Sequence, residues 1–313
     1  MSGYMSGGTE IMHLWKKIEQ AAVFSDVPAF YSQKKTIPRF LKSIIFILIG
    51  IPFNLSAQDT ICLSPAIAHE IESKELGETR SHWVKLPLHY SDTLSYPVIY
   101  VLDAEWRFEL VSHLAFDLGG HDKIRKSIIV GIPHINLDKR GIDLTFSHSR
   151  VEYDGEAVDS TFYNRSNSGG AERFYKYLTT ELIPDVNRKY PTSDHESLIG
   201  HSYGGYFGGY ILSLDHPFEV IHMYDPSIWY SNCEVTTRIS KTKLHKPVKV
   251  YLTYQPEPEF HKLKIEELIS ELSENDMIEL LEIEYRDETH YSLFLDSFYH
   301  GIQITNVPKI ITK

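Results

Sequence analysis

The stretch Ser197-Leu198-Ile199-Gly200-His201-Ser202-Tyr203-Gly204-Gly205 decides the fold expected for this chain. Its first three residues end an apolar run typical of a buried strand, and residues 203–214 have the pattern of a helix. The residues between match G-x-S-x-G, in which a strained turn from strand to helix exposes the serine hydroxyl above a sheet. Glycines on either side let neighbouring backbone approach closely. This stretch makes Ser202 the candidate nucleophile.

The rest of the chain supplies further elements of the same kind. Residues 133–168 carry turn-forming residues with little periodicity, which predicts a long loop near a site. Pro184 is expected to kink or divide the helix that begins near residue 171. Strands alternating with helices predict an α/β fold, with a mostly parallel central sheet and helices on both faces. The other expected strands lie within residues 82–90, 96–102, 127–132, 220–224, 248–252 and 280–285, and the other expected helices span 263–272 and 294–299.

Composition excludes several classes of protein. The 313 residues include 31 basic and 42 acidic side chains, a net charge of −11 that is repelled by phosphate backbones and argues against nucleic-acid binding. The chain has no glycine-rich phosphate loop, no H-E-x-x-H and no carboxylates at metal spacing, so we expect neither metal nor cofactor. The two cysteines, Cys62 and Cys233, are expected as unpaired thiols, although one bridge between them stays open in an oxidising compartment.

The N-terminal segment has the pattern of a secretory signal peptide. Basic residues between Lys34 and Lys42 precede an apolar run at 44–53, and small residues follow up to Ala57. The run of about ten residues is shorter than the ~20 that span a membrane, so no stable insertion is expected after cleavage. We therefore expect an extension over residues 1–57, a single domain over 58–313, and a periplasmic or secreted protein.

A serine nucleophile needs a base and an acid that orients this base, in the chain order serine, acid, histidine. Of the histidines after Ser202, only His290 lies in a polar loop directly after the last expected strand, at the sheet edge where Ser202 is expected. The acid is expected after strand 248–253, which gives Glu257 first and Glu259 second, with Asp225 after strand 220–224 as a third option.

Two backbone N–H groups are expected to bind the oxyanion. The residue after the nucleophile, Tyr203, supplies one at the start of its helix. The other is expected from the loop after strand 96–102, at Ala104 or Glu105. His201, beside the nucleophile, is expected only to pack.

Together these residues resemble the putative-esterase branch of the α/β-hydrolases, which includes bacterial siderophore esterases related to enterochelin esterase and esterase D-like proteins. The resemblance covers most of the chain after residue 71. The chain departs from the family pattern at two positions. Family members often have Asp-Gly where this chain has Asp103-Ala104, and they often have serine where this chain has Asp225. The matching segments are residues 72–80, 100–103, 130–133, 143–145, 169–190, 199–205 and 225–230, together with Arg140 and His290.

The resemblance implies an α/β-hydrolase fold and ester hydrolysis through an acyl-serine, with Ser202 and His290 at the matched catalytic positions. It leaves open a Ser–His pair without a strong acid. Arg140 and Trp229 are expected either to line the substrate pocket or to pack. The expected substrate is a small-molecule ester, such as an aryl or siderophore-like one. The alternatives are a carbohydrate esterase acting on acetyl or feruloyl groups, and a non-catalytic binding protein that kept the fold.

Overall fold

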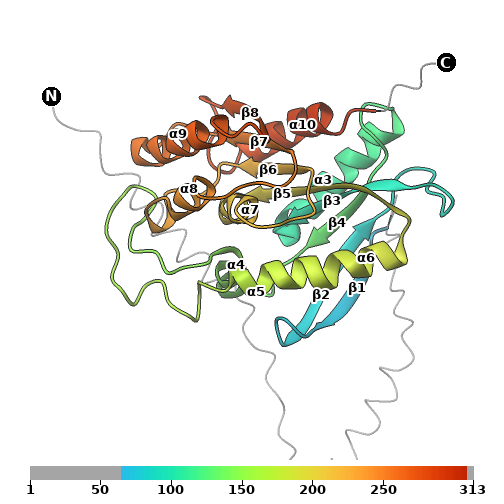
Figure 1. The fold of residues 1–313 in the computed structure, drawn as a ribbon. Helices are drawn as coiled ribbons and strands as arrows, with labels where there is room; N and C mark the ends of the chain where they lie inside the picture. The colour runs from blue at the N-terminus through green and yellow to red at the C-terminus, as the bar shows by residue number, and fades with distance from the viewer. Residues whose placement is uncertain (1–64, 309–313) are drawn as a thin grey trace, which may run out of the picture. The chain divides into compact units, whose positions relative to one another are not determined.

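The computed structural model describes residues 65–308, and the expected signal segment and Cys62 lie outside them. Within the described chain, eight strands form one sheet in the order β1-β2-β4-β3-β5-β6-β7-β8 (Figure 1). Strands β1 and β2 are antiparallel to their neighbours, and the pairs from β4 to β8 are parallel. The sheet is therefore mostly parallel, as predicted. The strands are β1 (Ile67–Ser73), β2 (Glu78–Lys85), β3 (Tyr96–Leu102), β4 (Ile128–Ile132), β5 (Thr192–His201), β6 (Val220–Tyr224), β7 (Val248–Tyr254) and β8 (Ile278–Glu284).

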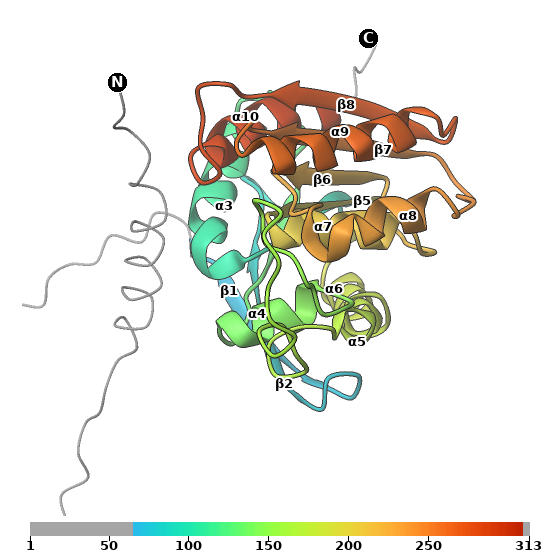
Figure 2. The ribbon, with the colours of Figure 1, turned by 90° about the vertical axis from the view of Figure 1, so that its left-hand side faces the viewer.

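Helices cover both faces of the sheet, as the alternating pattern predicts (Figures 1 and 2). One face packs against α3 (Ala104–Gly120) and α10 (Leu293–Thr305), which bury Phe108 and Phe298 with one core cluster. The helices of the other face bury a second, larger cluster. They are α5 (Ala171–Tyr177), η1 (Leu178–Leu182), α6 (Ile183–Lys189), α7 (Tyr203–Leu212), α8 (Glu234–Ile239) and α9 (Glu259–Ser273).

Two helices and the edge hairpin differ from the sequence-based expectation. The residues after β3 begin the 17-residue helix α3, whose Phe108, Val111, Ala115 and Leu118 are buried at helical spacing. The expected loop 133–168 contains α4 (Leu137–Leu144), which begins where the Asn136 side chain accepts a hydrogen bond from the Lys139 N–H at 2.9 Å. The expected strand within 82–90 lies earlier, as β2, and pairs with the unforeseen strand β1.

Pro184 was expected to kink or divide its helix, and a π-helical turn lies immediately before it. Residues 178–182 form this turn, and the Ile183 N–H donates to the Leu178 carbonyl five residues earlier. Proline lacks an N–H and crowds the preceding turn, so the wider turn accommodates its ring. The chain continues as α6 with Pro184 in its first turn, where no N–H is needed.

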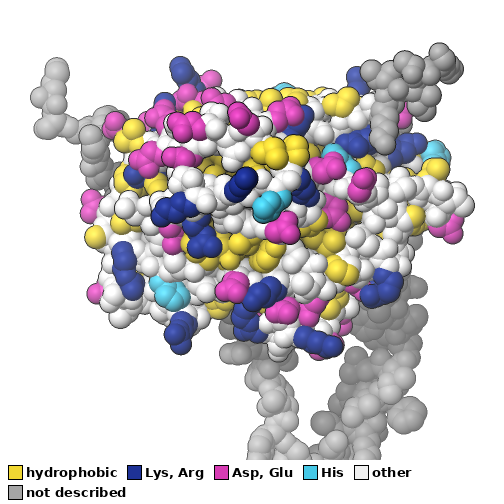
Figure 3. All heavy atoms as spheres, in the orientation of Figure 1, with side chains coloured by type: hydrophobic (Ala, Val, Ile, Leu, Met, Phe, Trp, Pro, Cys, Tyr) yellow, Lys and Arg dark blue, Asp and Glu magenta, His cyan; other side chains and the backbone are white. Residues whose placement is uncertain are grey.

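On the face drawn in Figure 3, acidic side chains are most frequent toward the upper edge, and basic side chains form no continuous surface. Lysine and arginine side chains there are interspersed with aspartate and glutamate. Such a face lacks the continuous basic surface that phosphate backbones require. Within residues 65–308, no helix combines the length and apolar character needed to cross a membrane.

Candidate active site

Ser202 lies on the tight turn between β5 and α7 that the sequence predicts. Its φ of 60° and ψ of −118° are strained for a residue with a side chain. The turn requires a glycine two residues earlier, because a Cβ on Gly200 would lie 2.2 Å from the Gly204 carbonyl oxygen. The Ser202 N–H donates to the Tyr224 carbonyl oxygen at 3.0 Å, which ties the turn to the end of β6. Ser202 is partly exposed.

Asp225 follows β6 as Ser202 follows β5. The two strands are parallel neighbours in which His201 pairs with Tyr224, so the next residues along each strand are Ser202 and Asp225. Asp225 is fully buried, and its Oδ2 lies 2.6 Å from Nδ1 of His290. His290 comes from the loop after β8, and its side chain is 31% exposed. The carboxylate therefore holds an imidazole that reaches solvent beside the nucleophile turn.

The Asp225 carboxylate accepts three further hydrogen bonds. Its Oδ1 accepts from the Gln255 backbone N–H at 3.1 Å and from His261 Nε2 at 2.9 Å, and its Oδ2 accepts from Gln255 Nε2 at 3.4 Å. Burial alone would raise the pKa of Asp225, but the hydrogen bonds from His261 and His290 outweigh it and hold this pKa well below the usual value. The acid is therefore ionised throughout the neutral range.

The expectation that Glu257 orients the histidine does not agree with this geometry. Glu257 and the second choice, Glu259, are exposed, while the third choice, Asp225, holds His290. The loop after β7 contributes Gln255, whose side chain bonds both Asp225 and the Glu257 main chain. The carboxylate that contacts His290 therefore follows β6, which is one strand closer to the nucleophile turn than β7. The available signal was an aspartate directly after the neighbouring strand, at a position where the family frequently has serine.

His201 anchors the loop that carries His290 rather than only packing. Its Nε2 lies 2.6 Å from the His290 carbonyl oxygen, and its Nδ1 lies 3.4 Å from an Arg107 guanidinium nitrogen. Burial lowers the pKa of His201 well below its usual value, and the charges of His290 and Arg107 act in the same direction. A neutral ring that accepts at Nδ1 and donates from Nε2 satisfies both contacts.

The Ser202 hydroxyl does not contact the imidazole in this structure. Its Oγ lies 3.3 Å from Oγ of Ser227, a buried residue whose N–H donates to the Ser202 carbonyl oxygen at 3.1 Å. Catalytic hydrogen bonds are often long or misaligned without substrate, so this arrangement is compatible with a resting nucleophile.

The predicted oxyanion donors lie at two helix N-termini on neighbouring strands. Ala104 begins α3 after β3, and Tyr203 begins α7 after β5, and these parallel strands are adjacent. The first N–H groups of a helix have no acceptor within the helix. Glu105, whose backbone N–H was the other predicted donor, follows Ala104 in the first turn of α3, and its carboxylate accepts from the His134 N–H at 3.1 Å. Both helices thus bring their first N–H groups to the ends of β3 and β5, on the side of the sheet that carries Ser202.

Arg140 and Trp229 were expected at the substrate pocket or in packing, and the structure favours the second role for both. Arg140 binds both oxygens of Asp103, at 2.6 and 2.9 Å, and lies 3.5 Å from the His201 carbonyl oxygen. Its guanidinium also lies 5.3 Å from the centre of the Tyr203 ring. Trp229 is only 7% exposed and belongs to the larger core cluster.

A chain of buried ionisable groups supports the turn at Asp103. Nε2 of His134 lies 3.6 Å from Oδ1 of Asp103, and its Nδ1 lies 2.8 Å from Oδ2 of Asp143. Arg80 of β2 in turn bonds both oxygens of Asp143 at 2.7 Å. Paired charges of this kind stay buried only because each has its partners. The network fixes the end of β3 and the first turn of α3.

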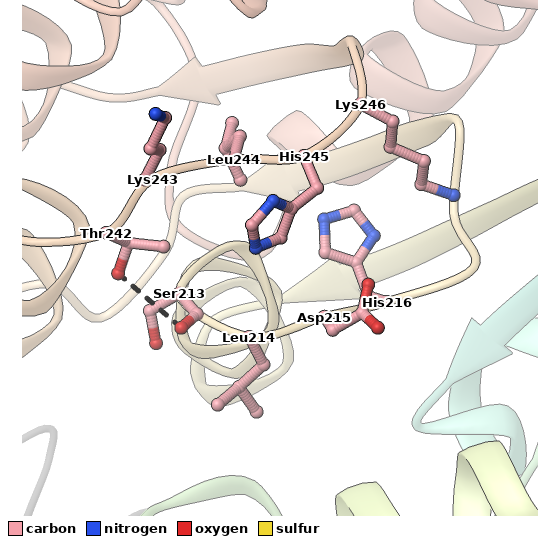
Figure 4. Close-up of a pocket in the computed structure, with 9 residues that line it drawn as sticks. All are labelled: Ser213, Leu214, Asp215, His216, Thr242, Lys243, Leu244, His245 and Lys246. Carbon is pink, nitrogen blue, oxygen red and sulfur yellow. Dashed lines mark hydrogen bonds between the residues drawn. The ribbon is translucent and has the colours of Figure 1, made fainter.

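A cavity of about 140 Å³ lies away from these residues. It is lined by residues after α7 and before β7, among them His216, His245 and Lys246 (Figure 4). These segments lead into β6 and β7, so they lie at the opposite sheet edge from Ser202 and Asp225. Ligands of such sheets bind beyond the carboxyl ends of the strands, which excludes this cavity as the catalytic pocket.

Two further predictions concern metal ions and cysteines. Among residues 65–308, no group of three or more histidine, cysteine, aspartate or glutamate side chains has an arrangement that could hold a metal ion. Cys233 is a buried free thiol, and burial raises its pKa to about 12. Its thiol is therefore protonated and unreactive at neutral pH.

The strand order and the serine turn define an α/β-hydrolase, as the sequence predicts. Residues 73–228 match the family model described as Putative esterase, and the chain belongs to this family. Together with its relatives, this membership makes the protein a serine esterase, a hydrolase of carboxylic esters.

The relatives include proteins with named activities. The chain is 24% identical to the ferri-bacillibactin esterase BesA of Bacillus subtilis, a match that covers 65% of this chain and 74% of the relative. It is 27% identical to an IroE-like serine hydrolase of Shewanella oneidensis, with a TM-score of 0.69 over 77% of this chain and 79% of the other. The BES protein of Bacillus cereus, 22% identical, has the same fold with a TM-score of 0.68 over 81% of this chain and 99% of the other.

Proposed function

We propose that this esterase cleaves aryl or siderophore-like esters through an acyl-serine, with Ser202, His290 and Asp225 as its catalytic triad. The observation that carries the proposal is the 2.6 Å contact between His290 Nδ1 and a buried carboxylate one strand away from the nucleophile turn. An ionised carboxylate only accepts hydrogen bonds, so Nδ1 carries the proton. Nε2 is then left with the lone pair that a general base needs.

In the proposed reaction, the Ser202 side chain rotates from Ser227 to His290. As Ser202 Oγ attacks the ester carbonyl carbon, His290 Nε2 takes the hydroxyl proton, and Asp225 stabilises the imidazolium. The Tyr203 and Ala104 N–H groups stabilise the oxyanion. His290 then protonates the leaving alcohol, which departs and leaves the acyl-serine. Water, deprotonated by His290, attacks the acyl carbon, and the departing Ser202 oxygen takes the proton back.

The proposed substrate class rests on exposed aromatic side chains near this machinery. Trp106, in the first turn of α3, is 55% exposed. Tyr291 is 74% exposed, and its ring centre lies 5.1 Å from that of His290. Exposed aromatic rings beside a reactive centre suit a planar aromatic ligand. The names of the relatives, which include a ferri-bacillibactin esterase, support the same class.

A panel of acetyl, butyryl, feruloyl and triscatecholate esters tests the proposal. We expect hydrolysis of aryl esters and the highest kcat/KM on the catecholate or feruloyl member, with Ser202→Ala as the inactive control. A clear preference for small acetyl esters of sugars would favour a carbohydrate esterase. No turnover of any ester by folded wild-type protein would overturn the proposal.

We also propose that the protein is exported and acts in the periplasm or outside the cell. The proposal rests on the basic and apolar pattern of residues 34–57. Expression of the full chain, fractionation of the cells and N-terminal sequencing test it. Cleavage near Ala57 is the expected result, and an uncleaved cytoplasmic product would contradict it.

A further inference from the structure

The Asp225 carboxylate binds two histidines, one on each oxygen. His290 contacts Oδ2, and His261, in the first turn of α9, places Nε2 2.9 Å from Oδ1. The His261 side chain is only 4% exposed, and within residues 65–308 its Nδ1 has no hydrogen-bond partner. The hydrolytic steps proposed above make no use of this second imidazole.

The contacts of His261 define its protonation state. Asp225 is ionised and only accepts hydrogen bonds, so the proton of His261 lies on Nε2. A second proton would have to sit on Nδ1, which is buried and faces no acceptor. An unpaired buried donor on a charged ring is costly, so His261 is a neutral donor to Oδ1.

We infer that His261 is a positioning residue that acts through Asp225 and thereby tunes the base His290. The inference rests on the function proposed above. Asp225 lies on a turn with a φ of 40°, and rotation of its short side chain would direct Oδ2 away from His290. The Nε2–H group of His261 donates to Oδ1, the oxygen that does not contact His290, and so opposes this rotation of the Asp225 side chain. It also draws negative charge toward Oδ1, which reduces the stabilisation that Oδ2 gives to a protonated His290.

A pair of variants separates this role from simple packing. His261→Leu keeps an apolar side chain of moderate size but has no donor. His261→Gln keeps a donor, because its amide nitrogen reaches approximately as far as the imidazole Nε2. The substrate is p-nitrophenyl acetate, with kcat and KM measured across pH 5 to 9 and the melting temperature recorded for each variant.

For His261→Leu we expect kcat to fall about tenfold or more and KM to change by less than about threefold. The acidic limb of kcat/KM should move to higher pH, because without the His261 donor the Asp225 carboxylate carries more negative charge on Oδ2, beside the imidazole. His261→Gln should return the limb to its wild-type position and recover most of kcat. The inference would be overturned if both variants lost the same share of kcat and the acidic limb of kcat/KM stayed at its wild-type pH. His261 would then serve only in packing.

A spectroscopic readout keeps the inference separate from the proposed function. The proton between His290 Nδ1 and Asp225 should appear far downfield in the ¹H NMR spectrum. Its resonance should shift in His261→Leu and return in His261→Gln, and an unmoved resonance would overturn the inference whether or not the enzyme turns over. Failure of the wild-type protein to hydrolyse any ester would instead overturn the proposed function alone.

Discussion

The turn after β3 and the turn after β5 have related backbone geometry and different side-chain environments. Each leaves its strand through a non-glycine residue of positive φ, 56° at Asp103 and 60° at Ser202, and each starts a helix at the next residue. Asp103 is buried, with both carboxylate oxygens bound by Arg140. Ser202 is partly exposed, and its hydroxyl has one long contact, 3.3 Å to Ser227.

The difference shows how a fold can use one backbone device for two purposes. At Asp103 the side chain is fixed, and in the proposed reaction the group that acts is the N–H of the following residue, Ala104. At Ser202 the backbone is fixed, and the useful group is the side chain itself. Arg140 connects the two turns, because it binds Asp103, lies 3.5 Å from the His201 carbonyl oxygen and packs over Tyr203. Substitutions at the two positions should therefore affect different properties.

The largest expected effect is on turnover, at the second turn. Ser202→Ala removes the attacking oxygen and should lower kcat/KM for an aryl ester at least about 10²-fold, without lowering the melting temperature. Steady-state kinetics and thermal unfolding of the same preparation check both parts. A variant that kept a tenth of the wild-type activity would mean that Ser202 is not the nucleophile.

The next effect is on stability, at the first turn. Asp103→Asn leaves Arg140, whose side chain is only 15% exposed, without its ion-pair partner, so the free energy of unfolding should fall by about 3–5 kcal/mol. Urea unfolding measures this loss. The control is the double variant Asp103→Asn with Arg140→Gln, which should lose less than the sum of the single variants because their interaction is counted once. Simple additivity would show that the pair does not stabilise the turn.

Glycine at the two positions should change stability in opposite directions. Relief of the positive φ should make Ser202→Gly more stable than wild type by about 1 kcal/mol. Asp103, at φ 56° and ψ 40°, is in the left-handed region that aspartate tolerates, so Asp103→Gly gains less relief, loses the Arg140 pair and should be less stable than wild type. If urea unfolding showed that both glycine variants change the free energy of unfolding in the same direction, the distinction between the two turns would be wrong.

The smallest expected effect is on the pH dependence of stability. Burial alone would raise the pKa of Asp103, but the charge and hydrogen bonds of Arg140 outweigh it and lower this pKa. The group therefore stabilises the fold above its unfolded pKa of about 3.9 and loses this contribution as the pH falls below it. Between about pH 4 and pH 2, Asp103→Asn should lose less stability than wild type, whereas Ser202→Ala should follow wild type. If Asp103→Asn lost more stability than wild type between these pH values, the predicted direction of the pH dependence would be wrong.

The sequence predicted what local patterns determine. The apolar strands and the pentapeptide around Ser202 predicted the parallel sheet and the serine turn, because both depend on neighbouring residues. Helix α3 was missed although Phe108 and Val111 stand at helical spacing, since the polar residues after β3 resemble a loop. The contact between Asp225 and His290 depends on how the loop after β8 crosses two strand ends. Asp225 stands directly after its strand, which is a local signal, but only the course of the loop after β8 shows that His290 contacts it and not Glu257.

The roles of Arg140 and His261 were beyond sequence reasoning for the same reason. Each acts on a residue more than 30 positions away along the chain, and a single arginine or histidine in a helix gives no indication of its partner. Their partners, Asp103 and Asp225, are brought to them by the packing of α4 and α9 against the rest of the fold, which no local sequence pattern shows.

The central claim is that Ser202 Oγ becomes covalently acylated during turnover. Incubation of folded protein with a fluorophosphonate probe, followed by intact mass measurement and peptide mapping, tests it most directly. We predict a single adduct on Ser202 in wild type and none in Ser202→Ala. A wild-type protein that stays unmodified, or carries the adduct on another residue, would contradict the account.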